Sequence, residues 1–118
     1  MLKGLGGLGA LGDMGKMMKA AQEMQGRMAQ LQQDLETIIV EGESGAGLVR
    51  ATATAKGTLT GLSIDPSIFS AEDKEVVEDL ILAAIRDVQT RAQERAREEM
   101  GKLAESMGLP RDMNLPNF

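Results

Sequence analysis

The sequence contains no histidine, cysteine, tryptophan or tyrosine, and its only aromatic residues are Phe69 and Phe118. Without histidine and cysteine the chain lacks the commonest general base, the thiolate nucleophile, and the nitrogen and sulfur ligands of zinc and iron-sulfur sites. Any catalysis would have to rest on carboxylates, lysine, serine or threonine. We therefore expect a protein that is not an enzyme and that uses no metal, cofactor or small-molecule substrate.

Long apolar runs are also absent. The N-terminal segment M-L-K-G-L-G-G-L-G-A-L-G-D is faintly similar to a signal peptide, but six glycines in the first fifteen residues interrupt it, and no other run is long enough to cross a bilayer. The lack of cysteine fits a reducing compartment. These features predict a cytoplasmic protein with no membrane partner, whose residues 1–12 form a flexible, glycine-rich arm.

The length of 118 residues and the hydrophobic content of 42% suit a single domain, which we place at residues 13–108. Residues 109–118 contain two prolines and little pattern, and we predict an extended tail there. With only two aromatic residues, the apolar surface that one chain can bury is limited. Association of identical chains could supply the missing burial, so we expect a homo-oligomer.

A helix is predicted from residue 14 to residue 38, with Asp13 as its N-cap. Its apolar residues alternate at spacings of three and four, which places them at the a and d positions of a heptad: Met14, Met17, Ala21, Met24, Met28, Leu31, Leu35 and Ile38. Because methionine is flexible, this seam is adaptable. Two interpretations stay open, a helix packed on its own domain and a helix packed against its symmetry mate.

Three short antiparallel strands are predicted next, in the segments T-I-I-V-E-G-E, L-V-R-A-T-A-T-A-K and T-L-T-G-L-S-I-D. Strict alternation in the second places Val49, Ala51, Ala53 and Ala55 on one face, where small side chains suit a closely packed helix. Asp65 and Pro66 end the third strand.

The segment G-E-S-G-A-G-L-V at residues 42–49 is glycine-rich but does not suit a phosphate. A phosphate-binding glycine loop leads directly into a helix N-terminus, whereas this loop leads into a strand and is flanked by Glu41 and Glu43. We interpret it as a hairpin connection with glycines at positive φ.

A second helix is predicted from Ser70, which with Asp73 resembles a capping box, to an end signal at Gly108 and Pro110. Its acidic first turns favour the helix dipole and need no catalytic role. Beyond Val88 the apolar stripe thins to alanine, and acidic and basic residues stand four positions apart. A helix of about 35 residues is about 50 Å long, so we expect its second half to project beyond the core.

The net charge of -5 argues mildly against a nucleic-acid partner, but the basic residues are unevenly distributed. One group comprises Lys16, Lys19 and Arg27 on the first helix, with Lys3 on the arm, and the other is the run Arg91, Arg95 and Arg97. Neither group has interleaved aromatic residues, which excludes base stacking on single strands. Spacing alone favours solvated helical faces with internal ion pairs.

The ordered features together resemble the YbaB/EbfC family of nucleoid-associated DNA-binding proteins. The matching segments, in order, are M-K-A-A-Q-E-M-Q-G-R-M, V-E-G-E-S-G-A-G-L-V, G-L-S-I-D-P-S, E-D-L-I-L-A-A-I-R-D-V and a terminal L-P-N-F. The chain departs from the family pattern at Arg86, where asparagine is usual, and in its tail P-R-D-M-N-L-P. These departures leave the expected fold unchanged.

The resemblance implies an α+β protomer, ordered helix-strand-strand-strand-helix with an antiparallel sheet, that forms an intertwined, tweezer-like homodimer. It further implies binding of duplex DNA with limited sequence preference, and roles in nucleoid organisation and gene regulation. Carried over to this chain, phosphate contacts are expected from the basic residues of both helices and the arm: Lys3, Lys16, Lys19, Arg27, Arg91, Arg95, Arg97 and Lys102.

A second interpretation is a protein-interaction or chaperone-like module. The acidic net charge and the methionine-rich seam favour it, because methionine surfaces adapt to varied partners.

Overall fold

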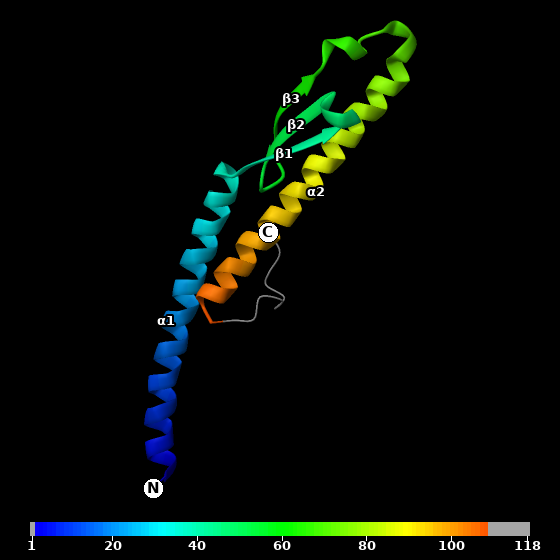
Figure 1. The fold of residues 1–118 in the computed structure, drawn as a ribbon. Helices are drawn as coiled ribbons and strands as arrows, with labels where there is room; N and C mark the ends of the chain where they lie inside the picture. Colours follow the sequence, from blue (N-terminus) through cyan, green and yellow to red (C-terminus); the bar gives the residue numbers. More distant parts are fainter. Residues whose placement is uncertain (1, 109–118) are drawn as a thin grey trace. The chain divides into compact units, whose positions relative to one another are not determined.

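The computed structural model describes the backbone of residues 2–108 and the side chains of residues 13–70 and 72–108 (Figure 1). The elements follow the order α1 (Leu2–Thr37), β1 (Ile39–Ser44), β2 (Val49–Thr54), β3 (Leu59–Ile64) and α2 (Lys74–Ser106). This order confirms the predicted α+β class. The chain divides into two compact units, Met1–Gln30 and Leu31–Phe118.

The first unit consists of α1 up to Gln30. This helix begins at Leu2, so the predicted N-cap at Asp13 is wrong. Each glycine weakens a helix by about 1 kcal/mol relative to alanine without forbidding it, and the leucines between the glycines are good helix formers. The predicted mobility of residues 1–12 stays a prediction. On this helix Met17 and Met18 are each 70% exposed.

The second unit contains a three-stranded antiparallel sheet in the order β1-β2-β3. The β1–β2 connection is a 3-10 turn at Gly45–Gly47 in which three consecutive residues have positive φ: Gly45 at 59°, Ala46 at 55° and Gly47 at 91°. The chain then enters β2 directly. The hairpin interpretation of this glycine-rich segment is therefore confirmed.

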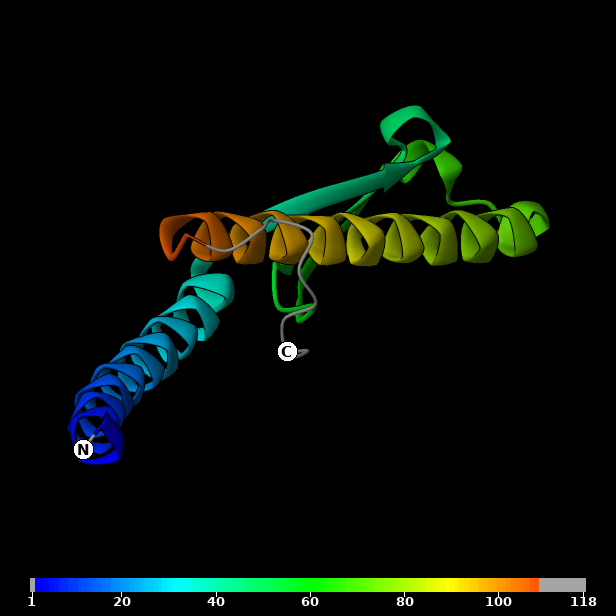
Figure 2. The ribbon, with the colours of Figure 1, turned by 90° about the horizontal axis from the view of Figure 1, so that it is seen from below.

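The helix α2 lies along one face of the sheet, mainly against β1 and β2 (Figures 1 and 2). The buried contact joins Val49, Ala51 and Ala53 of β2 to Ala84 and Val88 of α2. This confirms the predicted apolar face of the second strand. Because two of the three β2 side chains are methyl groups, the helix axis can approach the sheet closely.

The start of α2 differs from the predicted capping box. Ser70 Oγ accepts a hydrogen bond from the backbone N–H of Glu72 at 3.3 Å, and a 3-10 turn at Ala71–Asp73 precedes the first α-helical residue, Lys74. The Asp73 N–H donates to the Ser70 carbonyl at 3.0 Å. Serine thus caps the tighter turn rather than the α-helix itself. At the other end, Gly108 has φ 76°, as its predicted stop role requires.

A second apolar cluster surrounds the later turns of α2. Leu31, Leu35 and Ala55 are buried, and Ala96, Met100 and Leu103 of α2 pack against them together with Ile38. The expectation that the second half of α2 projects beyond the core is therefore wrong. Leu31 and Leu35, at the end of the heptad seam, pack against the later turns of α2, so the last turns of α1 cover this part of α2.

Within the described residues, neither helix combines the length and the apolar content needed to span a membrane.

Candidate nucleic-acid interface

The basic residues predicted on the first helix are exposed. Lys16, Lys19 and Arg27 all lie on α1 within the first unit. Lys16 and Arg27 are eleven positions apart, about three helical turns, so they share one face. Lys16 and Lys19 have no carboxylate of a described residue within 4.0 Å. The side chain of Lys3, also predicted to contact phosphate, lies outside the described residues.

Arg91 on α2 forms an ion pair with a carboxylate of the same helix. Its Nε donates to Asp87 Oδ2 at 3.2 Å, and the same oxygen accepts the backbone N–H of Glu43 in β1 at 2.8 Å. The hydrogen bond from Glu43 lowers the pKa of Asp87, burial opposes this shift, and Arg91 adds to the lowering. Asp87 is therefore a firmly ionised partner that couples Arg91 to the sheet.

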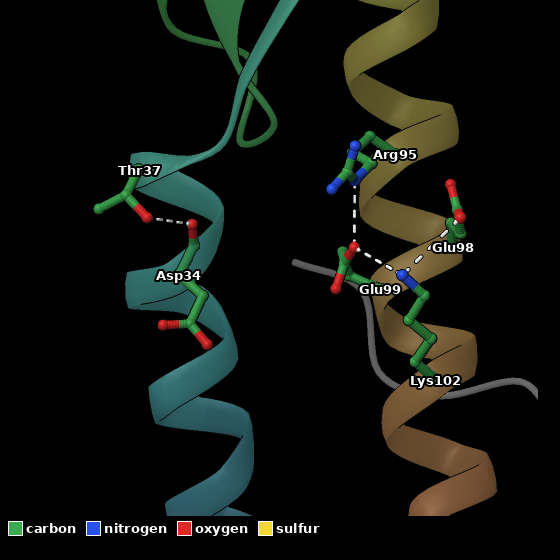
Figure 3. A network of polar contacts seen from close by, with 6 residues as sticks. All are labelled: Asp34, Thr37, Arg95, Glu98, Glu99 and Lys102. Atoms are coloured by element: carbon green, nitrogen blue, oxygen red, sulfur yellow. Dashed lines mark hydrogen bonds and ion pairs between the residues drawn. The ribbon is translucent and has the colours of Figure 1, made fainter.

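Arg95 and Lys102 belong to one network around Glu99 (Figure 3). Glu99 Oε1 accepts from Arg95 Nε at 3.0 Å and from Lys102 Nζ at 3.3 Å. Lys102 Nζ also lies 3.9 Å from Glu98 Oε1. The pairs predicted at four-residue spacing are therefore present. Burial by itself raises the pKa of Glu99, but the hydrogen bonds from Lys102 and Arg95 outweigh it and hold the pKa below its ordinary value.

Arg97 differs from its neighbours because no carboxylate of a described residue lies within 4.0 Å of it. Arg86, which was not among the residues predicted to contact phosphate, has the same property. The two arginines are exposed and stand eleven positions apart, so they share a face of α2, and Arg97 lies about two and a half turns from the buried Val88. Arg97 also borders a hollow lined by Leu35, Ala55 and Lys56.

A signal for Arg86 was present in the sequence. The positions three and four residues away on either side of it hold alanine, glutamine, leucine and threonine, so no local carboxylate can pair with it. On α2 the geometry thus separates two classes of cation. Arg91, Arg95 and Lys102 are ion-paired, whereas Arg86 and Arg97 are open to an external anion.

Exposed cations on long helices are of the chemical type that contacts a phosphate backbone. The sequence profile of the YbaB/EbfC DNA-binding family matches residues 11–107. The chain belongs to this family. The resemblance noted from the ordered motifs is thereby confirmed, and with it the expectation that the protein is not an enzyme, since this YbaB/EbfC family is one of DNA-binding proteins.

Three curated relatives carry the name nucleoid-associated protein. The chain is 40% identical to one from Agrobacterium fabrum over 95 residues, which cover 80% of this chain and 89% of that protein. It is 41% identical to one from Methylocella silvestris over 96 residues, covering 81% and 90% respectively. It is 40% identical to one from Rhodospirillum rubrum, again over 96 residues with 81% and 90% covered.

A solved structure supports the YbaB/EbfC fold. The crystal structure of an uncharacterized protein from Helicobacter pylori matches with a TM-score of 0.62 at 26% identity, covering 77% of this chain and 91% of that one. In the part of the YbaB/EbfC chain that the structure describes, no three acidic side chains gather as a metal site would require.

Proposed function

We propose that this protein is a nucleoid-associated protein that binds duplex DNA as a homodimer, with limited sequence preference. It would act in the cytoplasm, at the nucleoid, and contribute there to DNA organisation and gene regulation. The observation that carries the proposal is the family match over residues 11–107. The nucleoid-associated relatives, about 40% identical over four fifths of the chain, support it.

The chemistry of the exposed helices supports contact with phosphate rather than with bases. Arg86 and Arg97 on one face of α2, and Lys16 and Lys19 on α1, are cations on regular helices with no aromatic residue beside them. Contacts to phosphate fix position but carry no sequence information, which accounts for limited preference. Binding of this kind releases counterions, so its affinity falls steeply with salt. The acidic net charge keeps the affinity low.

The open face of β3 supports a homodimer. Leu62 of β3 pairs with Ala51 of β2, so the two side chains share the sheet face that α2 covers over β1 and β2. Yet Leu62 is 50% exposed, and Leu59 is exposed on the same strand. Uncovered apolar residues beside a core mark an interaction site. A second copy would cover them and supply the burial that a chain poor in aromatic residues lacks.

The test is fluorescence anisotropy with two labelled duplexes of equal length and unrelated sequence, titrated with the full chain at low and moderate salt. We expect similar dissociation constants for both duplexes and a large loss of affinity between about 50 mM and 200 mM salt. No binding to either duplex at low salt would refute the proposal. A strong preference for one duplex would refute limited sequence preference.

A protein-interaction or chaperone-like module is the second candidate. The specific observation in its favour is the exposed methionine surface of α1, formed by Met14, Met17 and Met18. Replacing Met14 and Met17 with glutamine separates the two functions. DNA binding should persist in this variant, whereas binding to protein clients through the methionine surface should be lost.

A further inference from the structure

The contacts around Glu99 distinguish it from the other acidic residues on α2. It holds two cations at once, Arg95 at 3.0 Å and Lys102 at 3.3 Å, through the same oxygen. Its neighbour Glu98 has a single, looser contact with Lys102 at 3.9 Å. Figure 3 shows the Glu99 carboxylate between the two basic side chains.

Exposure strengthens this difference. The Glu99 side chain is only 19% exposed, whereas that of Glu98 is 54% exposed. Ion pairs in full contact with water are screened and contribute little, but a carboxylate that is largely shielded from water holds its partners more firmly. Both hydrogen bonds stabilise the charged form of Glu99, so it stays ionised at neutral pH.

We propose that Glu99 is a positioning residue that withholds Arg95 and Lys102 from DNA phosphates and thereby limits the affinity of the protein for DNA. This inference rests on the proposed DNA-binding function. A phosphate that approaches either cation must displace the carboxylate, which stays behind as a repulsive charge beside the incoming anion. The unpaired Arg86 and Arg97 meet no such competitor among the described residues.

The test compares Glu99→Gln with Glu98→Gln in the full chain. Each variant removes one negative charge from adjacent positions of the same helix, so a general charge effect predicts equal gains in DNA affinity. The proposal predicts that Glu99→Gln binds a random-sequence duplex roughly threefold to tenfold more tightly than wild type, and that Glu98→Gln gains much less. The salt dependence should steepen by about 1.8 per protomer for Glu99→Gln, because two further phosphates are neutralised.

A triple variant completes the experiment. Adding Arg95→Gln and Lys102→Gln to Glu99→Gln should abolish the gain, because the gain acts through these two cations. Circular dichroism at matched protein concentration verifies that each variant is folded.

Equal affinities for Glu99→Gln and Glu98→Gln, or a gain that survives in the triple variant, would overturn the inference while leaving DNA binding intact. If neither wild type nor any variant binds, the proposed function itself fails, and the inference falls with it.

Discussion

The backbone of Val88 lies so close to Gly42 that a Cβ built on Gly42 would stand 2.4 Å from the Val88 nitrogen and 2.6 Å from its Cα. Gly42 is in β1, and Val88 is at the buried centre of α2. The strand and the helix therefore meet through backbone atoms, and the obstacle to a side chain is rigid. No rotamer change of a neighbour could relieve it.

We expect Gly42→Ala to destabilise the protein by about 3 kcal/mol, because the helix must move away from the sheet. Chemical denaturation at fixed protein concentration measures this. Gly26→Ala is the matched control, since nothing lies within 4 Å of its Cβ position on α1. The control should be neutral or stabilising by up to about 1 kcal/mol. Equal stability of the two variants would contradict the close contact.

Asp87 should make stability depend on pH. Its pKa in the folded state is lowered, first by the hydrogen bond from the Glu43 backbone, against the opposing effect of burial, and then by Arg91. A lowered folded pKa gives a stabilisation that is present above the unfolded value of about 3.9 and is lost as the pH falls through the folded value. We expect Asp87→Asn to be about 1 kcal/mol less stable at neutral pH.

The same variant should lose less stability than wild type on acidification below about pH 4. Thermal unfolding followed across this range provides the measurement. Asp79→Asn serves as the control for removal of a carboxylate from the same helix, because Asp79 makes no hydrogen bond to a described residue. A curve for Asp87→Asn parallel to that of wild type would show that the carboxylate does not contribute as a charged acceptor.

The unpaired arginines of α2 should carry more of the DNA contact than an arginine on the sheet. We expect the double change of Arg86 and Arg97 to glutamine to weaken binding and to reduce the salt slope by about 1.8 per protomer. Arg50→Gln, which removes a cation paired with Glu41 at 3.2 Å on the sheet, should have a much smaller effect. Anisotropy titrations at several salt concentrations distinguish these outcomes. An unchanged slope for the double variant would remove α2 from the interface.

Replacing Lys16 and Lys19 with glutamine tests the contribution of α1 to DNA binding in the same assay. If DNA binding persists unchanged when both pairs are replaced together, the assignment of phosphate contacts to the two helices is wrong.

Leu62 should be needed for association of two copies. We expect Leu62→Asp to raise the dimer dissociation constant at least roughly tenfold, because a charge would be buried in an apolar contact. Sedimentation equilibrium measures the change. Ser63→Asp is the control, since adjacent residues of a strand point to opposite faces of the sheet. A dimer that tolerates Leu62→Asp as well as it tolerates Ser63→Asp would exclude this face as the interface.

Local patterns predicted the sheet and its buried face well. The alternation of Val49, Ala51 and Ala53 gives burial directly, because a strand turns every second side chain to one side. The ion pairs of Arg95 and Lys102 were also predictable, since helical spacing alone brings the partners together.

Contacts between distant parts of the chain were not predictable. One uniform seam runs from Met14 to Ile38, yet the buried residues on it are Leu31 and Leu35, which pack against α2. No local signal marks that change. The close approach of Val88 to Gly42 is of the same kind, because a glycine in a strand does not reveal which backbone it faces. Whether Arg86 and Arg97 form ion pairs within the helix depends on residues three or four positions away, which the sequence shows. Whether they contact DNA depends on how the protein is assembled, which the sequence does not show.

The alanine face of β2 has a consequence for how proteins of this type can change during evolution. The alanine side chains of β2 are already single methyl groups, so a smaller residue would remove almost nothing. A larger residue would clash with α2. The contact between β2 and α2 therefore tolerates little change of side-chain volume in either direction. The charges on the helices stand in water, where single exchanges cost little. We therefore expect divergence to concentrate there, so that the strength and lifetime of DNA complexes can be retuned one charge at a time on an unchanged frame.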